Sequence, residues 1–233
     1  AVETGAMLGM KAHAMGIRND LFLGVGNTFI RDVMLGIYDY LNATDDARQV
    51  PIVNLHCDVD HPTQTMADLL WLEQIFGDLA DHRIRVSWAY SPSFAKPLSV
   101  PQGLITLLTR VGAHVTLAHP EGYQLTDDTM AAAASNAAAG GSFRVVHDMD
   151  EAFGGADVVY PKSWGAYDLM VERVGANAAG DTAELARIEA RALERNAQHT
   201  DWICDESRMA QTAGADALYM HCLPADIGAE VSP

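Results

Sequence analysis

The second part of the chain alternates between strand-like and helix-like segments, and this alternation limits the fold more than any other feature. Strands are predicted for residues 83–90, 113–120, 142–148, 157–164 and 217–224. Helices are predicted between them, for residues 99–112, 125–141, 149–156, 182–197 and 205–215. Strands joined by crossover helices lie parallel to one another. The pattern therefore predicts an α/β fold with a Rossmann-like, doubly wound parallel sheet.

The first part of the chain is less regular. Helices are predicted for residues 2–15, 31–44 and 63–77, with a strand or loop over residues 16–27 and a β-branched strand over residues 50–55. This order indicates a smaller α/β unit that precedes the sheet.

Composition excludes several classes of protein. A net charge of −16 argues against binding to nucleic acid, which needs a basic surface. No apolar run is long enough to span a bilayer, so no membrane partner is expected. The start lacks the order of a secretory signal, and three scattered cysteines do not form a disulfide framework. A cytoplasmic location is therefore expected.

The segment His56-Cys57-Asp58-Val59-Asp60-His61 is the richest cluster of polar residues, and it allows two interpretations. The first is a metal site, with a metal-dependent hydrolase that uses His56, Asp58, His61 and His221. However, strand-like backbone would point neighbouring side chains to opposite faces, and no HxxxH or CxxC pair lies nearby. The metal site is the weaker alternative.

The second interpretation treats His61-Pro62-Thr63-Gln64 as the start of a helix. Pro62 suits the first helical position, and His61 would then be the N-cap. A histidine and a glutamine at a helix N-terminus can stabilise a carbonyl oxygen that gains negative charge, while the amide oxygen accepts from an –NH2 group. A histidine that merely caps a helix is the simpler alternative.

Three further segments follow predicted strands, where ligands of such sheets bind. Residues 90–103 contain no GxGxxG pattern, which counts against a dinucleotide. Lys162 and Trp164 could bind a carboxylate and an aliphatic chain, or be a solvated lysine and a core tryptophan. Cys222 could orient a substrate amine or simply pack in a strand.

Together, HPTQ at 61–64 and HCLP at 221–224 resemble the two signature motifs of the aspartate/ornithine carbamoyltransferases. The segments 88–103, 115–123, 158–165 and 217–226 are similar to the knotted branch of that family, which includes the N-acylornithine carbamoyltransferases and the YgeW-type proteins. The resemblance covers essentially the whole chain.

The resemblance implies carbamoyl transfer from carbamoyl phosphate to an amino-acid-like amine, without cofactor or metal, in nitrogen metabolism. It implies that residues 1–76 are the end of a carbamoyl-phosphate domain and residues 77–233 a second-substrate domain. It also implies a homotrimer and a trefoil-knotted loop at about residues 92–101, an exception to the rule that chains do not knot.

The same resemblance assigns roles to individual residues. His61, Gln64 and Arg18 would bind carbamoyl phosphate, and Cys222 and Leu223 would hold the amine and the carbamoyl nitrogen; His61, Gln64, Arg18 and Cys222 are the candidate catalytic residues. The second substrate would be bordered by Lys96, Lys162, Ser163, Trp164, His221, Leu223 and Pro224.

One departure from the family is large. The Ser/Thr-Arg-Thr-Arg stretch that binds phosphate is missing from this sequence, as are the C-terminal helices. The chain is therefore expected to be an internal fragment with little activity alone. A relative that binds ligands without catalysis is a further alternative.

Overall fold

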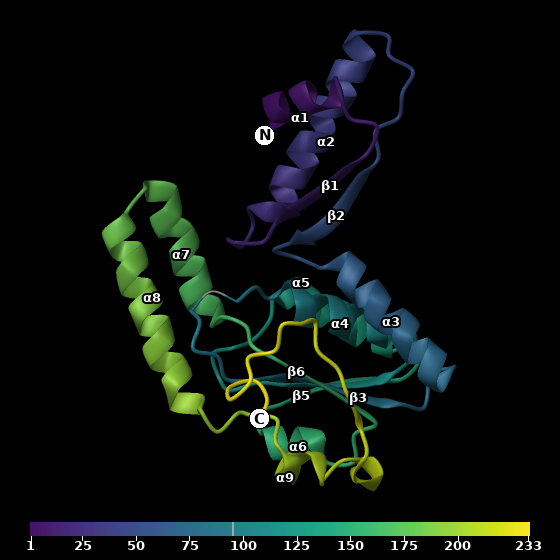
Figure 1. Cartoon of the computed structure of the whole chain (residues 1–233), viewed down its shortest axis with the longest axis vertical. Coiled ribbons are helices and arrows are strands. Elements are labelled where there is room, and N and C mark those ends of the chain that lie inside the picture. The colour runs from purple at the N-terminus through teal and green to yellow at the C-terminus, as the bar shows by residue number, and fades with distance from the viewer. Residues whose placement is uncertain (95) are drawn as a thin grey trace.

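In the computed structural model, which describes residues 1–94 and 96–233, the chain forms two separate parallel sheets (Figure 1). The first unit consists of α1 (Val2–Gly9), β1 (Met15–Asn19), α2 (Gly26–Ala43) and β2 (Ile52–Cys57). β1 and β2 pair in parallel, and Val33, Ile37 and Leu41 of α2 are buried against Ile17 of β1.

Helix α1 ends at Gly9, earlier than the predicted Met15, and residues from Met15 onward form β1 instead. Arg48 explains part of this difference because its guanidinium donates to the carbonyl oxygens of Gly9 (3.1 Å) and Ala12 (3.2 Å). These bonds satisfy carbonyls that a longer helix would have used.

The second sheet contains β3 (Arg83–Trp88), β4 (His114–Ala118), β5 (Ser142–Val146), β6 (Val158–Lys162) and β7 (Leu218–Tyr219). All neighbouring strands are parallel, in the order β5-β4-β3-β6-β7. The predicted α/β fold with parallel strands is confirmed. The chain reverses its direction of strand addition between β3 and β6, and ligands of such sheets bind at this point.

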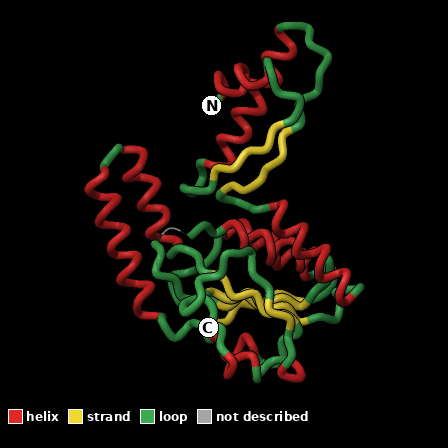
Figure 2. Tube along the Cα trace, in the orientation of Figure 1, coloured by secondary structure: helices red, strands yellow, loops and turns green. Residues whose placement is uncertain are grey.

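Helices cover both faces of this sheet (Figure 2). On one face lie α3 (Pro62–Phe76), α4 (Ser99–Arg110) and α5 (Asp127–Ala137), and on the other α6 (Met149–Phe153) and α9 (Glu206–Met209). Trp88, Ile84 and Val86 of β3 are at most 1% exposed, and Leu72 of α3 is buried in the same core. Helix α3 therefore shares its core with the second sheet.

One helix was missed, and two predicted elements are shorter in the structure. The long segment after β6 contains a helical hairpin of α7 (Tyr167–Ala179) and α8 (Thr182–Asn196), and α7 had not been predicted. The predicted helix over 205–215 shortens to α9, and the backbone of Thr212 is already extended, with ψ 173°. The predicted strand over 217–224 is only β7, and the segment beyond it turns through a cis Leu223–Pro224 bond.

The loop expected to be threaded, at about 92–101, includes Ala95, which lies outside the described residues. Among the described residues, no helix is both long and apolar enough to cross a membrane.

Candidate active site

Polar side chains from both sheets converge on one cavity of about 240 Å³. Each comes from a segment at or after the carboxyl end of a parallel strand, or from the start of the following helix. The lining residues are Arg18, His56, His61, Lys96, Pro97, Val100, Lys162, Cys222, Leu223 and Pro224. The cavity thus brings together most of the predicted site residues; Gln64, Ser163, Trp164 and His221 lie outside its lining.

His61 is the N-cap of α3, as the sequence predicted. Its Nδ1 accepts a hydrogen bond from the backbone N–H of Gln64 at 3.3 Å. Burial, with a smaller contribution from Arg18, lowers the pKa of His61, so the ring is neutral at pH 7. Because Nδ1 accepts, the proton of the neutral ring belongs on Nε2. His61 can therefore donate this hydrogen to a ligand.

The side chain of Gln64 is held by Asp68, one turn along α3. Gln64 Nε2 donates to Asp68 Oδ1 at 2.9 Å, and the hydroxyl of Tyr160 donates to Asp68 Oδ2 at 3.0 Å. Since the amide nitrogen is bonded to Asp68, the amide oxygen is left to accept a hydrogen bond. This arrangement suits recognition of an –NH2 group.

Arg18, Asp20, His56 and Ser99 form a chain of contacts beside His61. Arg18 pairs with Asp20 at 3.1 Å, and Asp20 Oδ2 lies 3.4 Å from His56 Nδ1. The other nitrogen of His56 contacts the hydroxyl of Ser99 at the start of α4, and its ring stacks on His61 with centroids 4.2 Å apart. Burial lowers the pKa of His56 to about 4. His56 is therefore neutral at pH 7, and its contacts connect β2 of the first sheet with the start of α4.

Lys162, Ser163 and His221 all contact Glu230, a fully buried carboxylate. Glu230 Oε1 accepts from Lys162 Nζ at 2.9 Å and from the Ser163 backbone N–H at 2.8 Å. His221 Nε2 lies 3.0 Å from Oε2. Burial would raise the pKa of Glu230, but His221, Lys162 and Ser163 hold it well below its usual range. The structure thus places Ser163 and His221 against this carboxylate.

Lys96 carries a second ion pair at the cavity, with Asp226 Oδ2 at 3.0 Å. This pair is accessible to solvent, with side chains 25% and 32% exposed, whereas those of Lys162 and Glu230 are 8% and 0% exposed. Water can therefore reach the pair of Lys96 with Asp226 far more easily than the pair of Lys162 with Glu230.

The remaining predicted residues divide between cavity and core. Cys222 lines the cavity, and burial raises the pKa of its thiol, which therefore stays protonated at pH 7. Leu223 is 76% exposed at the cavity rim, next to Pro224. Trp164 is 1% exposed, and its Nε1 donates to the Tyr123 carbonyl oxygen at 2.8 Å.

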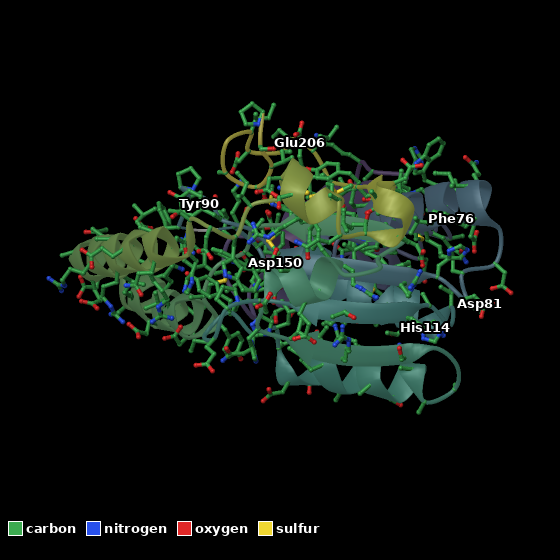
Figure 3. All side chains as sticks on the ribbon, turned by 90° about the horizontal axis from the view of Figure 1, so that it is seen from below. Phe76, Asp81, Tyr90, His114, Asp150 and Glu206 are labelled. Atoms are coloured by element: carbon green, nitrogen blue, oxygen red, sulfur yellow. The ribbon has the colours of Figure 1, made fainter. Side chains whose placement is uncertain are left out.

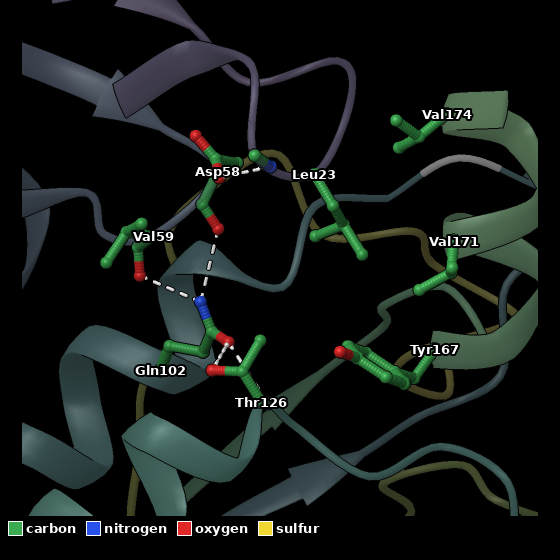
Figure 4. Close-up of a pocket in the computed structure, with 9 residues that line it drawn as sticks. Leu23, Asp58, Val59, Gln102, Thr126, Tyr167, Val171 and Val174 are labelled. Carbon is green, nitrogen blue, oxygen red and sulfur yellow. Dashed lines mark hydrogen bonds between the residues drawn. The ribbon is translucent and has the colours of Figure 1, made fainter. Parts of the chain in front are cut away.

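A second hollow, of about 340 Å³, lies at the seam between the first unit and α7 (Figure 4). Gln102 is its main polar group, but its amide nitrogen donates to the carbonyl oxygens of Asp58 and Val59, and its amide oxygen accepts from Thr126. Asp58 accepts from the backbone N–H groups of Gly24 and Asn27, both at 2.7 Å. These groups are occupied in joining the segments, so this hollow offers little for recognition.

A family model described as aspartate/ornithine carbamoyltransferase, Asp/Orn binding domain, matches residues 98–233. The chain belongs to the aspartate/ornithine carbamoyltransferase family. It is 52% identical over 229 residues to the Escherichia coli K12 protein named "Putative carbamoyltransferase YgeW", covering 97% of this chain and 58% of that protein. It is 37% identical over 181 residues to N-acetylornithine carbamoyltransferase of Xanthomonas campestris, covering 75% of this chain and 47% of that enzyme.

Solved structures of members of this family also resemble the chain. A complex of N-acetyl-L-ornithine transcarbamylase with acetylcitrulline matches with a TM-score of 0.76 and 30% identity, over 99% of this chain and 63% of that one. The same scores are found for a mutant bound to carbamyl phosphate and N-succinyl-L-norvaline. The chain spans less than two thirds of the length of these relatives.

Sequence reasoning missed the acidic partners of the site residues: Asp20, Asp68 and Glu230. Only Asp68 had a local signal, since it lies four residues after Gln64 on the same helix face. Glu230 reaches Lys162 across 68 positions of sequence. In the part of the chain that the structure describes, no group of three or more His, Cys, Asp or Glu side chains is placed to hold a metal ion.

Proposed function

We propose that this chain forms part of an active site that transfers the carbamoyl group of carbamoyl phosphate to the amine of an amino-acid-like molecule. The observation that carries the proposal is the arrangement at the start of α3. There a neutral His61 has its Nε2 hydrogen available, and Gln64 has its amide oxygen available. The two groups match the carbonyl oxygen and the –NH2 of a carbamoyl group.

In the proposed reaction, the amine attacks the carbamoyl carbon, a new C–N bond forms and the bond to the phosphate oxygen breaks. The electron pair of the broken bond leaves with phosphate, and the phosphate takes up the proton that the amine loses. His61 and Arg18 would stabilise the negative charge that develops on the carbonyl oxygen. Gln64 would fix the –NH2 group, and Cys222 with the Leu223 carbonyl would orient the amine.

The finer family features are part of the same proposal. They are the division into residues 1–76 and 77–233, a homotrimer and a threaded loop near residues 92–101. The contacts of Asp226 with Ser91 and Lys96 support close packing of that loop against the C-terminal segment. A cytoplasmic location fits the small-molecule substrates proposed.

The cations of the cavity restrict the second substrate. Arg18, Lys96 and Lys162 each face a carboxylate of the chain, at 3.1, 3.0 and 2.9 Å. A substrate carboxylate must therefore displace one of these partners. We propose that it displaces Asp226 from Lys96, because this pair is more exposed than the pair of Lys162 with Glu230.

The proposed function is tested by phosphate release from carbamoyl phosphate with a panel of amines, using the full-length protein. We expect release that depends on the amine and falls about 10²-fold in Gln64→Ala, because the –NH2 group loses its partner. Gln74→Ala, an exposed glutamine on the same helix, is the control and should be unchanged. If no amine supports release while carbamoyl phosphate still raises the melting temperature, the chain is a binding-only relative.

Lys96→Met tests the restriction on the second substrate. It should raise KM about tenfold or more for amines that carry a carboxylate, because a charge-assisted hydrogen bond is lost. Amines without a carboxylate should show little change in KM. An equal rise for both kinds of amine would contradict a role in carboxylate recognition.

A further inference from the structure

Three arginines gather on one face of the second sheet, far from the proposed active site. Arg83 and Arg85 lie on alternate positions of β3, and Arg85 pairs in register with Thr116, which pairs in turn with Arg144. Alternate residues of a strand point to the same face. The arginines line a hollow of about 400 Å³ together with Asp81, His114, Thr116 and Ser142.

This hollow lies at the amino ends of the strands, opposite to the carboxyl ends where the active-site cavity lies. Arg83, His114 and Ser142 are the first residues of their strands, whereas the cavity lies beyond the carboxyl ends. In Figure 3, Asp81 and His114 lie toward one end of the strands, and Tyr90, which follows β3, lies toward the other. A ligand here would not contact the residues assigned to carbamoyl transfer.

Arg85 is the unusual member of the cluster. It is 6% exposed, and its Nη1 donates to the His114 carbonyl oxygen at 3.2 Å, but its Nε is buried without a hydrogen-bond partner. Among residues 1–94 and 96–233, no carboxylate forms an ion pair with Arg85. Burying an unpaired charge is costly, so this guanidinium is suited to bind an anion.

The two neighbouring arginines repel Arg85 and provide no counter-charge for it. Arg83 pairs with Asp157 at 3.0 Å and Arg144 with Glu151 at 2.6 Å, so each has its own carboxylate. Burial, followed by repulsion from Arg144 and Arg83, lowers the pKa of Arg85 to about 10. Arg85 is therefore the one arginine of the three whose charge has no carboxylate of its own among the described residues.

The groups around Arg85 match a phosphate better than a carboxylate. Thr116 and Ser142 contribute hydroxyls, and His114 Nδ1 lies 2.9 Å from Ser142 Oγ. Several donors directed at one small anion, including planar guanidinium groups, are typical of phosphate recognition. The one unpaired acid of the lining, Asp81, is exposed.

We propose that the hollow around Arg85 binds a phosphate group, either inorganic phosphate or that of a small phosphomonoester. The guanidinium of Arg85 would be the central donor, with Arg144 and the hydroxyls of Thr116 and Ser142 around it. The site is distinct from the carbamoyl-phosphate site of the proposed function.

Phosphate titration of the full-length protein tests this site, with chloride added to keep ionic strength constant. A ligand that binds the native state raises the melting temperature. We expect Arg85→Gln to weaken the phosphate response about tenfold or more in apparent Kd. Arg144→Gln, at an exposed side chain, should also weaken it, while Arg110→Gln, an exposed arginine outside the hollow, should not.

The Arg18→Gln variant distinguishes phosphate bound at the proposed active site from phosphate bound around Arg85. If the Arg85 site exists, the Arg18→Gln variant still responds to phosphate. The double variant with Arg18→Gln and Arg85→Gln should lose this response. An unchanged response when Arg85→Gln is added to Arg18→Gln, or a complete loss of the response in Arg18→Gln alone, would overturn the proposal. Glycerol phosphate distinguishes a phosphomonoester from free phosphate, and a response to citrate alone would also overturn it.

Discussion

Replacing Glu230 by Gln should lower the free energy of unfolding by about 3–5 kcal/mol, because it leaves the buried ammonium of Lys162 without a counter-charge. Lys162 is 7% exposed and Glu230 0%. The carboxylate also accepts from the Ser163 backbone N–H and from the Asp226 backbone N–H, at 2.8 and 2.9 Å. One change therefore weakens contacts of β6 and of the C-terminal segment together.

The stabilisation should depend on pH in a defined direction. The pKa of Glu230 is lower in the folded chain than the value of about 4.3 for an exposed glutamate. A carboxyl group of this kind stabilises the fold above its unfolded pKa, and this contribution is lost as pH falls through its folded value. The difference between wild type and Glu230→Gln should therefore be full at pH 7 and shrink below about pH 4.

Urea unfolding followed by tryptophan fluorescence measures both effects, since Trp88 and Trp164 are buried in the same hydrophobic core. Glu172→Gln is the matched control: Glu172 pairs with Arg191 at 2.8 Å, but both side chains are exposed. It should cost no more than about 1 kcal/mol. Equal losses in the two variants, or a Glu230→Gln effect that does not change with pH, would contradict the account of a buried ion pair.

The parallel sheet could be predicted because its signals are local. Runs of β-branched residues separated by amphipathic helices identify β3, β4 and β6 without any knowledge of their neighbours. Helix α7 could not be found in this way, although Gly180 ends it with a φ of 68°. The last strand was predicted too long because its backbone pairing with β6 stops at Met220, whose N–H donates to the Val159 carbonyl oxygen, although the apolar residues continue beyond it.

Some residues of the candidate site could likewise be predicted from local sequence, and others could not. The helix cap formed by His61 and its spacing to Gln64 can be read from four consecutive residues. The acids that orient or neutralise the site act across the fold, as Asp68 does with Tyr160 and Glu230 with Lys162. Such pairs are fixed by strand order and by the return of the C-terminal segment, which no local pattern encodes.

His61→Ala should reduce kcat/KM for carbamoyl transfer about 10²–10³-fold, which is the usual effect of removing one oxyanion donor. The Nε2 hydrogen of the neutral ring is the donor in question, because Nδ1 is occupied by the Gln64 backbone N–H. The loss should appear in kcat as well as in kcat/KM, since the negative charge on the carbonyl oxygen develops in the transition state.

The pH profile provides a readout that loss of packing alone would not produce. Burial and Arg18 lower the pKa of His61 below the ordinary histidine value of about 6.5. Wild-type kcat/KM should therefore be flat near pH 7 and fall only at more acidic pH, where protonation of Nδ1 breaks its bond with the Gln64 N–H. That acid limb should disappear in His61→Ala, whereas His13→Ala, at an exposed histidine, should retain both the limb and the rate. An unchanged acid limb in His61→Ala would assign the titration to another group and remove His61 from the reaction.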